Sequence, residues 1–125
     1  MKQILVVDDS SVQRKIIIQI IRQAGFNNDI LEAGNGEEAI QVLGSHFKTV
    51  GLILCDWHMP EMNGIEFIEG VANVPAVANI PVVMVTTAGT EEKLKQAYSV
   101  HPNLKGYIVK PFTADKLKIV IAPFL

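Results

Sequence analysis

Residues 4–14 read ILVVDDSSVQR, and this stretch decides the fold. Four apolar residues lead into the acid pair Asp8 and Asp9, and Ser10 with Gln13 three residues later forms a capping box that starts a helix. An apolar run without polar alternation is typical of a strand that is covered on both faces. The stretch therefore predicts a buried strand that turns directly into a helix, with two carboxylates in the turn.

The same strand and helix unit recurs along the chain. Strands are predicted at residues 3–7, 29–33, 52–55, 82–85 and 107–109. Helices are predicted to start after the N-cap residues Ser10, Asn35, Asn63, Thr90 and Thr113. In the first helix, apolar residues fall on one face: Val12, Ile16, Ile17, Ile20, Ile21 and Ala24. Parallel strands need helical crossovers, so the pattern predicts an α/β fold, a doubly wound five-stranded parallel sheet with five helices.

The composition sets the class of protein. The chain has 125 residues, of which 49% are hydrophobic, so we expect one domain over residues 1–125 with a single core. A formal net charge of −2 creates no field that would attract nucleic acid or an anionic membrane, so neither is expected as a partner. Cys55 is the lone cysteine, and the first apolar run is interrupted by acids before it could anchor the chain. We expect a cytoplasmic protein.

Five polar residues each follow an apolar run: Asp8, Asp9, Asp56, Thr86 and Lys110. Parallel strands bring these residues to the carboxyl edge of the sheet, where open α/β folds bind ligands. Two carboxylates about 4 Å apart repel by roughly 4 kcal/mol at an effective dielectric constant near 20, so three together require a cation. Oxygen ligands favour Mg²⁺. The sequence therefore predicts a metal site at which a central carboxylate attacks phosphorus, with a lysine as counterion and a threonine as hydrogen-bond donor.

The same residue types also occur without any metal or phosphoryl chemistry. An acid at a strand end is often only a turn former, and for Asp8 or Asp9 taken alone this is the commoner meaning. The histidines have no mutual ligand spacing, which disfavours a zinc site. Cys55 lies on a predicted buried strand and is expected to be a small core residue.

Four segments carry a resemblance to a known family: ILVVDDSSVQR, LILCDWHMPEMNGIEF, PVVMVTTAG and GYIVKPF. Over its whole length the chain resembles the receiver domain of two-component response regulators, and it looks most like the single-domain chemotaxis type. The resemblance implies a flavodoxin-like sheet of order 2-1-3-4-5. It also implies a signalling module rather than a conventional enzyme, one that catalyses only its own phosphorylation and dephosphorylation.

The resemblance assigns roles to the predicted site. It implies that Asp56 accepts a phosphoryl group from the phosphohistidine of a sensor histidine kinase or phosphotransfer domain. It implies a Mg²⁺ ion held by Asp9, Asp56 and the backbone carbonyl of His58, with Asp8 acting largely through water.

The resemblance also implies a switch, and Tyr107 together with nearby lysines indicates an output surface. Thr86 and Lys110 would contact the phosphoryl group, Tyr107 would swing inward with Thr86, and the bond between Lys110 and Pro111 would be cis. A downstream effector would bind the face formed by the fourth helix, fifth strand and fifth helix. Five lysines lie near that face and favour an acidic partner: Lys93, Lys95, Lys105, Lys116 and Lys118.

Two other functions compete with this one. A phosphatase of the haloacid dehalogenase type also uses a strand-end aspartate and Mg²⁺, but it needs a second aspartate where this chain has His58, and it needs a cap domain. A receiver-like module that works without phosphate usually lacks some of the acids or the lysine, and this chain has them all. Both alternatives are disfavoured.

Overall fold

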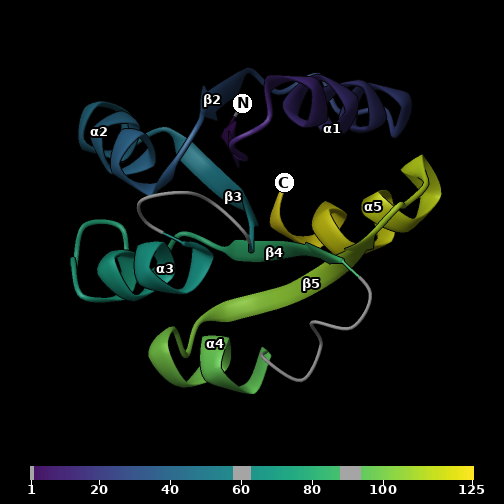
Figure 1. Cartoon of the computed structure of the whole chain (residues 1–125). Coiled ribbons are helices and arrows are strands. Elements are labelled where there is room, and N and C mark those ends of the chain that lie inside the picture. The colour runs from purple at the N-terminus through teal and green to yellow at the C-terminus, as the bar shows by residue number, and fades with distance from the viewer. Residues whose placement is uncertain (1, 58–62, 88–93) are drawn as a thin grey trace.

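The computed structural model describes residues 2–57, 63–87 and 94–125, and strands alternate with helices throughout (Figure 1). The strands are β1 (Gln3–Val7), β2 (Ile30–Ala33), β3 (Val50–Asp56), β4 (Val82–Thr87) and β5 (Leu104–Lys110). The helices are α1 (Ser11–Gln23), α2 (Gly36–His46), α3 (Gly64–Ala72), α4 (Leu94–Val100) and α5 (Ala114–Ile121), followed by the short 3₁₀ turn η2 (Ala122–Phe124). Among the described residues, no helix is both long enough and apolar enough to cross a membrane.

The strands form one parallel sheet in the order β2-β1-β3-β4-β5, which confirms the predicted topology. Helices cover both faces, with α1 and α5 on one side and α2, α3 and α4 on the other (Figure 1). Alternate residues of β1 serve the two layers: Ile4 and Val6 pack with α1 and α5, whereas Leu5 and Val7 pack with the opposite helices. Burial on both faces explains why the strands lack polar alternation.

Three strands are longer than predicted. The segments expected at 52–55, 82–85 and 107–109 extend to Val50–Asp56, Val82–Thr87 and Leu104–Lys110. Gly51 and Gly106 lie near the starts of β3 and β5. Glycine has a low strand propensity, so these first residues were not predicted to belong to the strands. In β5, Val82 pairs with Leu104 and Val83 with Gly106, so Lys105 is an extra, bulged residue at the edge of the sheet.

Four of the predicted helix caps are confirmed. The side chains of Ser10, Asn35, Asn63 and Thr113 each accept a hydrogen bond from the backbone three residues later, at 2.8–3.2 Å. Thr90 lies outside the described residues. The capping box at Ser10 is only half formed, because the Ser10 amide donates to the Asp8 carboxylate rather than to Gln13. This hydrogen bond from Ser10 to Asp8 connects the start of the first helix to the acid turn.

Candidate metal and phosphoryl site

The three predicted acids meet at the carboxyl edge of the sheet. Val7 is in register with Cys55, so the residue that follows β1 lies beside the last residue of β3. Oxygens of Asp8, Asp9 and Asp56 lie within 4.8 Å of one another, and we call these residues the acid cluster. Asp8 and Asp56 are buried, whereas Asp9 is exposed. Crowded carboxylates of this kind are stable only when cations offset their repulsion.

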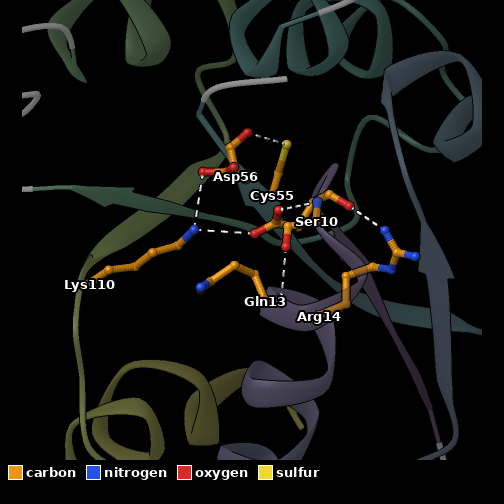
Figure 2. A network of polar contacts seen from close by, with 7 residues as sticks. Ser10, Gln13, Arg14, Cys55, Asp56 and Lys110 are labelled. Carbon is orange, nitrogen blue, oxygen red and sulfur yellow. Dashed lines mark hydrogen bonds and ion pairs between the residues drawn. The ribbon is translucent and has the colours of Figure 1, made fainter. Parts of the chain in front are cut away.

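Lys110, at the end of the edge strand β5, brings a positive charge to the acid cluster. Its Nζ atom lies 3.2 Å from Asp8 Oδ2 and 3.5 Å from Asp56 Oδ1 (Figure 2). The peptide bond between Lys110 and Pro111 is cis, as the resemblance implied. The predicted gathering of lysine and acids from separate strands is therefore confirmed.

Asp8 is held by protein donors on both carboxylate oxygens. The Ser10 amide donates to Oδ1 at 2.9 Å, and Lys110 donates to Oδ2 at 3.2 Å. Burial of a carboxylate is costly unless such partners replace the lost water. Asp8 therefore anchors the turn, and the exposed Asp9 is the acid of that turn that faces solvent.

Arg14 belongs to the site although the sequence interpretation did not include it. Its Nη1 atom donates to the Asp8 carbonyl at 2.6 Å, and its Nε atom donates to Glu32 at 3.0 Å. A signal for it existed in the sequence, because a cation in the first turn of a helix is disfavoured by the helix dipole. Such a residue indicates a nearby acceptor.

The predicted switch residues lie on β4 and β5. Thr86 is fully buried, and its hydroxyl donates to the Thr87 carbonyl at 3.2 Å. Tyr107 is 41% exposed. Thr87 was not predicted, although it is exposed and in register with Lys110. His58, expected to offer a backbone carbonyl, lies outside the described residues.

The thiol of Cys55 lies directly under the acid cluster. Burial raises its pKa well above the ordinary value, and the charges of Asp56 and Asp8 raise it further. Its Sγ atom donates to the Asp56 carbonyl at 3.3 Å. A neutral, buried thiol is a poor nucleophile, so Cys55 is not expected to react.

Comparison with known proteins identifies the family. The family model described as "Response regulator receiver domain" matches residues 4–122. The chain belongs to the response regulator receiver family. This receiver domain is 41% identical to the chemotaxis protein CheY1 of Helicobacter pylori, over 93% of this chain and 90% of the relative. It is 40% identical to a CheY homologue of Campylobacter jejuni, over 93% of this chain and 86% of the relative.

Solved structures agree with the sequence relatives. The chemotaxis protein CheY4 of Vibrio cholerae superposes with a TM-score of 0.84 at 28% identity, covering 100% of this chain and 99% of that structure. A receiver domain from Clostridium thermocellum shares the fold with a TM-score of 0.85 at 23% identity, covering 98% and 93% of the two chains. As a receiver domain, this protein is a phosphorylation-controlled signalling switch and not a conventional enzyme. Its family implies a histidine kinase as a partner, and its acid cluster is typical of the family's Mg²⁺ site.

Proposed function

We propose that residues 1–125 form one receiver domain that accepts a phosphoryl group from a phosphohistidine onto Asp56 and thereby changes its binding to an effector. The observation that carries the proposal is the acid cluster with Lys110 against two of its members. The similarity to CheY proteins favours a role in chemotaxis, with a cytoplasmic location as the matching expectation.

The acid cluster fits a divalent cation. Its oxygens lie within 4.8 Å of one another, and Lys110 offsets only one of three negative charges. Asp9, Asp56 and the backbone carbonyl of His58 would hold Mg²⁺, with Asp8 reaching it through water because its oxygens already bind protein donors. When bound, the ion supplies positive charge to the oxygens of the incoming phosphoryl group.

The chemistry belongs to Asp56 and Lys110. A carboxylate oxygen of Asp56 attacks phosphorus, the new O–P bond forms, and the bond from phosphorus to the donor's imidazole nitrogen breaks with its electron pair left on nitrogen. The Lys110 ammonium, 3.5 Å from Asp56 in the unmodified protein, pairs with a phosphoryl oxygen. The buried position of Asp56 limits access of water to the product.

Thr86 and Tyr107 supply the switch in this proposal. The Thr86 hydroxyl leaves the Thr87 carbonyl and donates to the phosphoryl group, and the half-exposed Tyr107 ring moves inward. Thr86→Ala should therefore still accept phosphate while Tyr107 fluorescence or NMR shifts stay unchanged. Lys110→Ala should also uncouple the switch. Normal phosphate-dependent effector binding by both variants would refute this coupling.

A groove beside the acid cluster suits the phosphodonor protein. The groove has a volume of about 530 Å³ and is lined by Ile16, Ile20 and Phe112 together with Gln13 and Lys110. Exposed apolar side chains next to a reactive site are typical of docking surfaces. We infer that a helix of the kinase or phosphotransfer domain packs here.

The docking proposal has a matched control. Ile16 and Ile40 are 42% and 43% exposed, on α1 and α2 respectively, and only Ile16 lines the groove. Ile16→Lys should slow phosphotransfer from the kinase without changing phosphorylation by acetyl phosphate, which needs no docking surface. Ile40→Lys should leave both rates unchanged. Equal rates of kinase transfer for the two variants would exclude this groove.

The effector is assigned to the face of α4, β5 and α5. Lys95, Lys105, Lys116 and Lys118 are exposed there, whereas Lys93 lies outside the described residues. Exposed lysines beside Tyr107 favour an acidic segment that also offers apolar side chains, with binding that weakens as salt rises. A Lys95→Glu/Lys116→Glu variant should lose phosphate-dependent effector binding, and Lys15→Glu/Lys48→Glu, on exposed positions elsewhere, should keep it.

The central test follows Trp57, which is buried and adjacent to Asp56. Its fluorescence should change in one saturable step with Mg²⁺ and in a second step with acetyl phosphate or beryllofluoride. Asp56→Asn should abolish the second step and the phosphoryl adduct seen by mass spectrometry. An undiminished adduct in that variant would overturn the assignment of Asp56.

A further inference from the structure

We propose that Arg14 is a positioning residue for the Mg²⁺ site, acting through the backbone of the acid turn. The inference rests on the proposed metal site and extends it to a residue whose side chain binds the backbone of the acid turn. Arg14 acts by fixing the peptide group that joins Asp8 to Asp9.

Arg14 connects three elements with one side chain. It starts from the first turn of α1, donates to the carbonyl of Asp8 after β1 at 2.6 Å, and donates to Glu32 on β2 at 3.0 Å (Figure 2 shows the first of these bonds). Its side chain is only 17% exposed. A guanidinium donates in a fixed fork, so two simultaneous bonds set its orientation as well as its position.

The bond to the Asp8 carbonyl completes a three-point attachment of that residue. Ser10 holds one carboxylate oxygen, Lys110 holds the other, and Arg14 holds the carbonyl. The carbonyl belongs to the peptide group that leads into Asp9, so its orientation determines where the exposed Asp9 carboxylate points. Partners of metal ligands commonly set metal affinity in this indirect way.

Charge and geometry predict opposite effects of Arg14 on Mg²⁺ binding. A positive charge near the acid cluster repels the ion, so removing it would tighten binding if charge were its main contribution. If Arg14 orients the turn, removing it weakens binding despite the lost repulsion. The sign of the change therefore distinguishes the two roles.

The test measures Mg²⁺ affinity by Trp57 fluorescence and by calorimetry. Arg14→Gln should weaken Mg²⁺ binding about tenfold, the usual effect of losing a partner of a metal ligand. Arg14→Lys keeps the charge but replaces the fixed fork of two donor nitrogens, Nε and Nη1, with a single flexible ammonium, so it should weaken binding similarly. Glu32→Gln loses the charged partner and should show a smaller loss in the same direction.

Arg22 provides the matched control on the same helix. Its guanidinium also donates to backbone carbonyls, those of Phe26 and Asn28 at 2.8 Å, but at the end of α1 away from the acid cluster. Arg22→Gln should lower the free energy of unfolding in chelator about as much as Arg14→Gln does, and leave Mg²⁺ affinity unchanged. This comparison separates positioning from general stability.

Each outcome decides between the proposals. Unchanged or tighter Mg²⁺ binding by Arg14→Gln, or equal losses in Arg14→Gln and Arg22→Gln, would overturn the positioning role and leave the metal site intact. Parental Mg²⁺ affinity in Arg14→Lys would show that the two-bond guanidinium fork is not required, and would overturn it as well. Absence of Mg²⁺ binding by the parent protein would overturn the metal site and the inference together.

Discussion

Asp8 and His101 are about equally buried, at 1% and 0% exposure, but the protein treats them differently. Asp8, at the carboxyl edge of the sheet, is bonded to Ser10 and Lys110. His101, just before β5 at the amino edge, has no hydrogen-bond partner for either ring nitrogen among the described residues. Burial lowers its pKa, and the charge of Lys105 lowers it further, so the neutral imidazole is favoured.

The difference shows where the fold maintains a buried charge. At the acid cluster, hydrogen bonds and a lysine compensate the charges that phosphoryl transfer requires. At the other edge, the imidazole fills space as a neutral side chain, and its unpaired nitrogens cost about 1–3 kcal/mol. The first site is built for chemistry and the second only for packing, and three experiments test this contrast.

The largest effect is expected from breaking the ion pair. Lys110→Met leaves the buried carboxylates of Asp8 and Asp56 without this cation. It should lower the free energy of unfolding in chelator by about 3 kcal/mol, the low end for a broken buried pair, because Lys110 is 20% exposed. Urea unfolding measures this loss.

A double variant checks the cause of that loss. Asp8→Asn/Lys110→Met removes one carboxylate together with the lysine, so it should recover much of the stability. If the single and double variants were equally unstable, lost packing of the lysine side chain would explain the effect better than the charges do.

A smaller effect is expected at the uncharged site. His101→Leu removes two unpartnered nitrogens and should raise the free energy of unfolding by about 1 kcal/mol at pH 7. The gain should grow toward pH 5. Below about pH 6.5 His101 of the unfolded parent binds a proton, whereas the native imidazole stays unprotonated until the pH reaches its lowered pKa. The free energy of unfolding of the parent therefore falls as the pH falls through this range.

The parent protein is the reference for this titration. Urea midpoints at pH 7 and pH 5 give the comparison. Parallel pH slopes for His101→Leu and the parent would show that folding does not lower the pKa of His101, and would contradict this prediction.

The smallest effect is expected at the exposed acid. Asp9→Ala removes one of three crowded like charges and should raise stability in chelator by about 0.5 kcal/mol, because solvent screens an exposed carboxylate. The gain should shrink at 1 M salt, and Mg²⁺ binding should weaken strongly. A lower melting temperature in chelator with normal Mg²⁺ affinity would contradict the repulsion argument.

The parts of this molecule that the sequence predicted depend on local pattern and topology. Apolar runs and N-cap residues located the strands and helices, and parallel topology then placed Asp56 and Lys110 at one edge. The predicted apolar face of α1 was too wide: Ile17 and Ile21 are buried, but Val12 is 63% exposed. Helical periodicity gives the direction of a stripe, and only the packed neighbours determine its width.

The parts that were missed depend on contacts across the fold. The bond from Arg14 to the Asp8 carbonyl has a backbone acceptor, which has no sequence signature. The capping box is half formed for a similar reason, because the Ser10 amide donates to the Asp8 carboxylate and not to the Gln13 side chain. The burial of His101 depends on how the turn before β5 folds against its neighbours. Such contacts become visible only when the chain is assembled in space.

The bulged lysine of β5 has a consequence for the protein in concentrated solution. β5 is an edge strand, and the free backbone groups of a regular edge can pair with a strand of another molecule and start aggregation. Lys105 breaks that regularity and places an exposed charge on the edge. Sheet-to-sheet polymerisation through β5 would have to bury this ammonium, so the strand within the proposed effector surface resists uncontrolled self-association.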